Sequence, residues 1–290
     1  MAFLSHLIYG LQLGAIYALV ALGYSMVYGI IRLINFAHGD IIMVASFVVW
    51  YLIARLNVPV WLSILICVAF TSLLGVAIEK LAYKPLRHSA RISLLITAIG
   101  ISFFLQNAAQ LIFGADPVMF ENLFPGNLSL GALTVSRVSV IIICVSIVLM
   151  IALVLLVNKT RMGRAMRAVS EDESTAALMG INVNTTISFA FALGSALAAV
   201  AAILYSCAYT QISPTMGGML GLKAFVAAVL GGIGSIPGAM LGGILIGICE
   251  TLTKAYISSS FADAIVFGIL IVVLIIRPSV LLGVKTKEKV

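Results

Sequence analysis

The sequence predicts an all-α fold, a polytopic integral membrane protein built as a helical bundle of about eight to nine spans. Charged residues make up 9% of the 290 residues and hydrophobic residues 62%, whereas about 25% of a soluble domain is charged. Apolar runs such as Val138–Val157 are continuous, while the strands of a membrane barrel would alternate apolar and polar residues. We therefore expect a single transmembrane domain over residues 1–290.

The apolar runs give the order of the spans. Single spans are expected at Leu4–Ile31, Ile41–Ala54, Trp61–Ile78, Ile92–Phe113, Val138–Val157, Ile187–Tyr209 and Phe261–Leu282. Before the last of them lies Leu222–Tyr256, which glycine and proline interrupt. This stretch either crosses the membrane twice, as a broken-helix pair, or enters and leaves on one side as a re-entrant hairpin.

Basic residues set the expected orientation, because cytoplasmic loops of membrane proteins carry an excess of Lys and Arg. Three segments share such an excess: Lys80, Lys84, Arg87 and Arg91; Lys159, Arg161, Arg164 and Arg167; and Lys285, Lys287 and Lys289 in the tail. Alternation of the spans then puts the C-terminus in the cytoplasm. The N-terminus and the loop Gly114–Arg137 fall outside.

Helix breaks occur in both halves of the chain. The later break holds Gly231, Gly232, Gly234, Pro237 and Gly238, and Gly and Pro are the poorest helix formers. A weaker counterpart, RLINFAHGD, follows the first span and ends at Asp40. Non-helical backbone at membrane depth is tolerated only inside protein or along a watery cavity. Paired interruptions of this kind indicate the substrate path of a transporter.

A second glycine pattern follows the later break. Gly238, Gly242, Gly243 and Gly247 form two consecutive GxxxG motifs. Small residues at this spacing let two helix backbones approach closely in a membrane. We expect this face to pack tightly against a neighbouring helix.

The long polar interval between apolar runs, residues 158–186, is the candidate coupling loop. Its members that bear on docking are Arg161, Arg164, Arg167, Glu171, Asp172, Glu173, Ala176, Ala177 and Gly180. The acidic trio of Glu171, Asp172 and Glu173 suits the N-terminus of a helix, and Gly180 suits its end. The segment is either a helix that docks on a motor protein or an ordinary solvated loop.

Polar residues inside the spans allow more than one interpretation. Ser102, Gln106 and Gln110 share one helix face, where they line a polar conduit or form interhelical hydrogen bonds. Glu250 and Lys254 are spaced to neutralise each other, which predicts a structural pair near the outer boundary. His38 and Asp40 lie at the inner end of the first span. They are either a proton relay or residues of a loop at the cytoplasmic interface, which needs no such role.

Several function classes are excluded by the sequence. No Gly-Lys dipeptide occurs, so there is no Walker A loop and the chain is not its own ATPase. GGIGSIPG lacks the spacing and the strand of a dinucleotide fingerprint. The four cysteines lie in apolar runs without metal-site spacing. The net charge of +7 comes from short loops and does not indicate nucleic acid. We expect no metal, no cofactor in this chain and no catalysis.

Four stretches resemble the permease subunit of bacterial branched-chain amino-acid ABC importers of the LivH type. They are GYSMVYGIIRLINFAHGD (Gly23–Asp40), AIGISFFLQN (Ala98–Asn107), RMGRAMRAVSED (Arg161–Asp172) with LMGIN (Leu178–Asn182), and KAFVAAVLGGIGSIPGAMLGG (Lys223–Gly243). The resemblance extends over essentially the whole chain. Related permeases of this group carry urea or other amides.

The resemblance implies an inner-membrane importer for Leu, Ile or Val. A second homologous permease would complete the pore as a heterodimer, two cytoplasmic ABC ATPase subunits would hydrolyse ATP with Mg, and a periplasmic amino-acid-binding protein would deliver the substrate. The EAAxxxG docking motif of importer permeases, set on Gly180, matches only at Ala176 and Gly180. Docking of Arg164–Gly180 is therefore expected without defined side-chain contacts.

The resulting expectation for the path combines the two breaks and the polar stripe. Asn35, His38 and Gly39 would flank it on one side and the break Gly231–Gly238 on the other, with helix N-termini receiving the substrate carboxylate. Replacing Gly234 or Gly238 with Leu is expected to abolish uptake while leaving assembly intact. The rivals are an ion-coupled secondary transporter, for which intramembrane ionisable residues are few, and a scaffold subunit without a pore.

Overall fold

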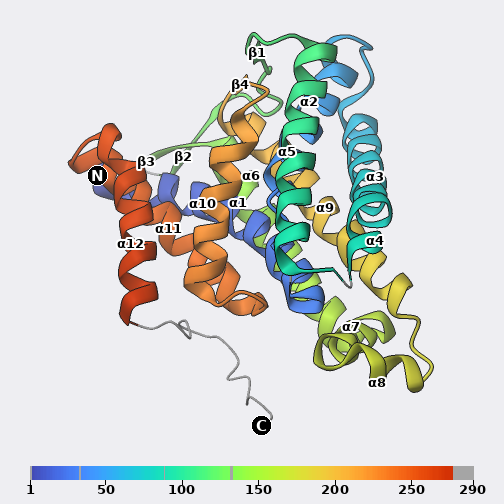
Figure 1. Cartoon of the computed structure of the whole chain (residues 1–290). Coiled ribbons are helices and arrows are strands. Elements are labelled where there is room, and N and C mark those ends of the chain that lie inside the picture. The colour runs from blue at the N-terminus through green and yellow to red at the C-terminus, as the bar shows by residue number, and fades with distance from the viewer. Residues whose placement is uncertain (1, 33, 88, 131–132, 277–290) are drawn as a thin grey trace.

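The computed structural model describes residues 2–32, 34–87, 89–130 and 133–276. Its helices form one bundle with a small helical extension at one end (Figure 1). In chain order the elements are α1 (Ala2–Ile31), α2 (His38–Ala54), α3 (Val60–Ile78), the π-helical turn η1 (Glu79–Tyr83), α4 (Lys84–Leu86), α5 (Arg91–Phe113), β1 (Val118–Met119), β2 (Asn127–Leu130), β3 (Leu133–Ser136), α6 (Arg137–Lys159), α7 (Arg161–Glu171), α8 (Glu173–Leu178), α9 (Val183–Ala208), β4 (Gln211–Ile212), α10 (Met216–Gly231), α11 (Ile236–Tyr256), the 3₁₀ turn η2 (Ser259–Phe261) and α12 (Ala262–Ile276).

The predicted helical membrane fold is confirmed. Seven helices of the described chain are long and apolar enough to cross a membrane, and α2 and α10 are shorter apolar helices of 17 and 16 residues. The broken pair starts at Met216, six residues before the predicted Leu222, and its two helices run antiparallel through the bundle (Figure 1). At 1.5 Å per residue α10 is about 24 Å long. This is shorter than the hydrocarbon core of about 30 Å, so the choice between two crossings and a re-entrant hairpin stays a prediction.

Helix α1 is the centre of the bundle. Its residues from Leu13 to Val27 are buried almost without interruption, because α6, α9, α10 and α11 all pack against it. The outer helices α3, α5, α6 and α12 leave many large apolar side chains exposed, including Leu73, Leu111 and Ile275. Such surfaces are stable where lipid or a partner helix replaces water.

The GxxxG face packs as expected. Gly243 and Gly247 of α11 lie directly against the backbone of Ala18 and Gly14 in α1, and Gly242 lies against Ala227 of α10. There is no space for a side chain at these three glycines. The close approach places α11 in the most extensive contact that any two helices make in the described part of the chain.

Glu79 joins the end of α3 to α9. Its buried carboxylate accepts hydrogen bonds from Arg87 at 2.7 Å and from the Ser188 hydroxyl at 2.7 Å. Arg87 also donates to the side chain of Asn184. The basic residue Arg87, which the charge pattern places in a loop, therefore also anchors η1 and α4 against the start of α9.

Four short strands were not predicted from the sequence. β1 pairs with β4 and β2 pairs with β3, both antiparallel, at the end of the bundle opposite α7 and α8 (Figure 1). The indole of Trp50 donates to the carbonyl of Met119 at 3.1 Å and ties β1 to α2. The polar loop 114–137 lacks an apolar period, but its backbone N–H and C=O groups still need partners, and the paired strands provide them.

The C-terminal part of the last predicted span, residues 277–282, and the tail lysines Lys285, Lys287 and Lys289 lie outside the described residues. The described part of that span is α12, which ends at Ile276.

We expect the α1–α11 contact to limit the stability of the protein. Gly243→Ala should lower the free energy of unfolding by about 1–3 kcal/mol, the usual cost of an extra group in a filled core, because its Cβ would meet Ala18. Gly268→Ala in α12 is the matched control, since a Cβ there meets no atom within 4 Å. Thermal unfolding of the two purified variants compares them, and equal losses would contradict this packing.

Candidate functional site

The end of α1 lies beside the later helix break, and the start of α2, after the earlier break, lies beside α10. Gly29, near the end of α1, faces Gly234 in the turn between α10 and α11, and a Cβ on Gly29 would lie 3.5 Å from the Gly234 Cα. Gly39 at the start of α2 packs against the backbone of Gly217 and Gly221 in α10. The structure thus brings together two segments that lie about 200 residues apart in the sequence.

Glycine is required at both ends of the later turn. Gly232 and Gly234 have φ angles of 102° and 90°, which L side chains rarely adopt. Gly231 and Gly238 contact each other through their backbones, so neither has space for a Cβ. The expectation that Gly238→Leu would leave assembly intact is therefore wrong, because a leucine there would force α10 and α11 apart.

At the later helix start, one N–H group has a side-chain partner and one is missing. The Ser235 hydroxyl accepts from the Gly238 N–H at 3.2 Å, and Pro237 has no N–H to offer. At the earlier break the Asn35 side chain accepts from the Tyr83 hydroxyl at 2.9 Å. Whether either helix start receives the substrate carboxylate stays a prediction.

Asp40 is the centre of a polar contact between α2 and α5. Its carboxylate is buried and accepts from the Ser102 hydroxyl and, at 2.9 Å, from the Gln106 side chain. Two residues of the predicted stripe thus form interhelical hydrogen bonds, while Gln110 is half-buried on the same helix. Whether the stripe also lines the substrate path stays a prediction.

His38 does not lie in an interfacial loop. It is the first residue of α2, it is 1% exposed, and its ring contacts the Tyr24 ring edge-on at 4.8 Å between centroids. Its Nε2 has no hydrogen-bond partner among the described residues. His38 is buried because α2 begins inside the bundle, against Gly23 of α1 and beside α10. The local sequence does not reveal this position.

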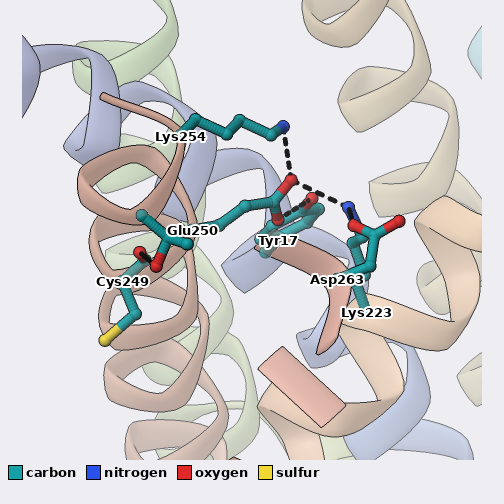
Figure 2. Close-up of polar contacts among 7 residues, drawn as sticks. Tyr17, Lys223, Cys249, Glu250, Lys254 and Asp263 are labelled. Atoms are coloured by element: carbon teal, nitrogen blue, oxygen red, sulfur yellow. Dashed lines mark hydrogen bonds and ion pairs between the residues drawn. The ribbon is translucent and has the colours of Figure 1, made fainter. Parts of the chain in front are cut away.

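Glu250 is the centre of a charged cluster inside the bundle (Figure 2). Its carboxylate is 1% exposed and accepts from Lys223 at 2.8 Å, from Lys254 at 2.6 Å and from the Tyr17 hydroxyl at 2.7 Å. Lys223 also pairs with Asp263 at 2.6 Å. The predicted pair of Glu250 and Lys254 is present, but it belongs to a network across α1, α10, α11 and α12.

The description of Glu250 and Lys254 as an isolated boundary pair is therefore incomplete. Tyr17 lies 233 residues before Glu250, and Lys223 lies 27 residues before it, so no local spacing relates them. One signal was available: Lys223 is a lone charge in the apolar stretch 216–231. An ionisable residue at that depth is costly and calls for a partner of opposite charge.

Two cavities meet beside this cluster. One has a volume of about 300 Å³ and is lined by Tyr17, Lys223, Glu250 and Lys254 together with aromatic and aliphatic side chains. The other, of about 370 Å³, is lined by Gln12, Ser139 and Asn122 together with apolar side chains such as Leu13 and Val138. Leu13, Tyr209 and Lys254 belong to both linings. Lys254 thus lies where the two cavities join.

The coupling loop folds as two short helices. Thr160 caps α7 by accepting from the Gly163 N–H, and Arg167 donates to the Val157 carbonyl at 2.7 Å, which fastens α7 to the end of α6. Asp172 caps α8 by accepting from the Thr175 N–H at 2.9 Å. Gly180 follows α8 with a φ of 83°. The predicted helix start in the acidic trio and the glycine stop are confirmed.

The charged members of the trio divide between the two helices. Glu171 is the last residue of α7, while Glu173 lies in the first turn of α8. Arg161 and Arg164 are exposed. Ala176 is buried against the rest of the loop, whereas Ala177 faces outward. Arg167, Asp172 and Ala176 therefore hold the loop together, and the other members of the coupling set form its surface.

Two apolar side chains at the tip of the loop were missed as candidates. Leu178 is 88% exposed and Met179 is 78% exposed. Both lie outside the apolar spans. A polar loop that presents two large apolar residues at its tip offers anchor residues for a protein partner. The signal in the sequence was the apolar dipeptide Leu178-Met179 within a polar loop. The charged residues around it obscured this signal.

Comparison with known proteins agrees with this architecture. A sequence profile of the family described as branched-chain amino acid transport system / permease component matches residues 6–274. The chain is 43% identical to the high-affinity branched-chain amino acid transport system permease protein LivH of Escherichia coli (strain K12) and to BraD of Pseudomonas aeruginosa, over 99% of this chain and 98% of each relative. This chain belongs to that family of transport permeases.

A solved structure shares the fold at low sequence similarity. The structure of PsaBC from Streptococcus pneumoniae in complex with Fab superposes with a TM-score of 0.52 at 14% identity, and the match covers 96% of this chain and 93% of that chain. The helical arrangement is therefore one that an experimentally determined protein also adopts.

We expect α8 to lose order at low pH. The Ser174 hydroxyl and then the Thr175 N–H hold the pKa of Asp172 below its usual value, so this carboxylate stabilises α8 above its unfolded-state pKa, and the effect is lost as pH falls through the folded-state pKa. Hydrogen-exchange protection of the α8 amides, relative to the intrinsic rate at each pH, measures this, and Asp172→Ala should show low protection at every pH.

Glu171→Gln is the control for this experiment, because the Glu171 side chain caps neither helix in the described structure. It should retain the pH dependence of the unchanged protein. If Asp172→Ala and Glu171→Gln exchanged alike, the capping role of Asp172 would be wrong.

Proposed function

We propose that this chain is the inner-membrane permease subunit of an ABC importer for branched-chain amino acids. The observation that carries the proposal is the identity of 43% over nearly the full length of two permeases named for branched-chain amino acid transport. The chain would act as one transmembrane domain beside a homologous permease. ATP hydrolysis would take place on two separate ATPase subunits, and a periplasmic binding protein would deliver Leu, Ile or Val.

The surface of α8 supports a role in energy coupling. Leu178 and Met179 are exposed apolar side chains, and Arg161 and Arg164 of the preceding helix α7 are exposed as well. This combination suits an apolar groove with an acidic rim on an ATPase. The cap at Asp172 and the bond from Arg167 hold this surface to α6. A push on α8 would therefore pass to α6, and through α6 to α1, against which it packs.

The orientation follows from the same assignment. ATPase subunits work in the cytoplasm, so the end of the bundle with α7 and α8 would face inward, as the basic residues predict. The end with the β-strands would then face the periplasm. The cavities beside Lys254 lie toward this outer side, near Tyr209, which follows α9, and the loop residue Asn122.

The glycine breaks support a moving element at the inner end. Gly29, Gly234 and the pair of Gly231 and Gly238 let α1, α10 and α11 meet through their backbones. Contacts between small residues allow helices to shift with little rearrangement of side chains. We infer that this joint opens and closes the inner end of the path flanked by Asn35, His38, Gly39 and the later break.

The test is uptake by proteoliposomes that contain the permease with its partner permease, its ATPases and its binding protein. We expect leucine uptake that requires internal ATP and that isoleucine and valine, but not urea, compete away. Met179→Asp should abolish uptake and release the ATPases, because a charge would enter an apolar groove.

Met119→Asp is the matched control for the coupling surface. Met119 is similarly exposed, at 73% against 78% for Met179, but lies in β1 at the opposite end of the bundle. It should keep the ATPases bound during purification. Equal ATPase retention by both variants would remove α8 from the coupling role, and uptake of urea in place of leucine would change the substrate.

A further inference from the structure

The charged cluster around Glu250 is electrically balanced. Lys223 and Lys254 supply two positive charges, and Glu250 and Asp263 supply two negative charges, joined by ion pairs of 2.6 to 2.8 Å (Figure 2). A cluster of net charge zero loses that balance if it takes up a cation or an anion. A ligand with one positive and one negative group preserves it, because each group meets a partner of opposite sign.

The cluster also has hydrogen-bonding capacity to spare. A carboxylate has about four acceptor positions and an ammonium has three donors. Glu250 accepts from three described donors, and Lys254 donates only to Glu250. Lys254 is the partly open member, with 40% of its side chain exposed, and it lines both cavities. Its free donors can therefore reach a ligand without breaking the inner ion pairs.

The adjoining cavity has the size and lining for a small aliphatic molecule. Its volume of about 300 Å³ is at the lower end of the range of about 300–1,000 Å³ for ligand pockets. Leu13, Met216, Met219 and Leu220 supply its apolar surface. The charged residues line the same cavity, so a ligand with a polar head and an aliphatic side chain would meet both surfaces.

We propose that this cavity is a recognition site in the permease itself for a free aliphatic α-amino acid in its zwitterionic form. The substrate carboxylate binds the Lys254 ammonium, the substrate ammonium binds the Glu250 carboxylate beside Tyr17, and the aliphatic side chain packs on Met216, Met219 and Leu220. The assignment rests on the proposed amino-acid cargo and adds that the permease, as well as a binding protein, reads both charged groups.

The lining also explains what the site would reject. An amide of leucine lacks the carboxylate and would leave the spare donors of Lys254 without a ligand acceptor, while 4-methylpentanoate lacks the ammonium and would place a second carboxylate next to Glu250. A polar site discriminates strongly against a ligand that leaves its buried groups unpaired. The two analogues therefore separate the contribution of Lys254 from that of Glu250.

The experiment measures binding of radiolabelled leucine to the permease–ATPase complex in lipid nanodiscs without binding protein. We expect leucinamide and 4-methylpentanoate to compete about tenfold or more less well than leucine, the effect of one lost charged hydrogen bond. Lys254→Met should weaken leucine binding about tenfold and remove its advantage over leucinamide, but keep its advantage over 4-methylpentanoate.

Glu250→Gln should give the opposite pattern, losing the advantage over 4-methylpentanoate alone. Lys80→Met removes an exposed lysine of η1 and should change nothing. Absence of leucine binding by the unchanged complex would overturn the proposal. So would an equal loss of binding for all three ligands in Lys254→Met, since that is the result of a purely structural ion pair.

The same preparations distinguish a failure of the proposed site from a failure of the proposed function. If the unchanged complex, given its binding protein, takes up leucine with ATP but fails the binding pattern, the site is wrong and the proposed function stands. If it takes up no branched-chain amino acid at all, the proposed function itself fails.

Discussion

The carboxylate of Glu250, buried in an apolar bundle, is the interaction on which the arrangement of four helices depends. A charge at that depth is costly unless partners surround it, and α1, α10 and α12 supply them through Tyr17, Lys223 and, by way of Lys223, Asp263. The requirement for these partners fixes how the four helices are rotated relative to one another. Apolar contacts alone specify this poorly in a membrane, because lipid is as apolar as the side chains.

The small residues make that arrangement sterically possible. Tyr17 reaches Glu250 because Gly243 and Gly247 let α11 lie directly on α1, and the same helix pair meets again at the glycine joint around Gly234. A polar lock on the side of the β-strands and a glycine joint at the α10–α11 turn therefore act on the same helices. A movement that α6 passes to α1 would affect both the polar lock and the glycine joint. It would therefore link the α8 surface to the cavity beside Lys254.

Much of this could be predicted from the sequence, for physical reasons. Continuous apolar runs gave the spans, and GxxxG spacing gave the α11 contact face, since both are properties of a single helix. The hydrogen bonds that join the helices could not be predicted, because they link residues 62 to 233 positions apart in the sequence. They are the bonds of Glu250 with Tyr17, Asp40 with Ser102, and Glu79 with Ser188. Burial of His38 likewise depends on how α2 enters the bundle, and the exposure of Leu178 and Met179 depends on the fold of the loop.

The central claim is that ATP binding on the partner subunits, acting through α8, controls access to the cavity beside Glu250. The direct measurement uses Met219→Cys, at a residue of the cavity lining, with the four native cysteines replaced by serine. The rate of its reaction with a membrane-impermeant thiol reagent from the periplasmic side is compared with and without a non-hydrolysable ATP analogue. We expect the nucleotide to change this rate severalfold, and to have no effect when Met179→Asp is added. The same rate in both nucleotide states would contradict the account.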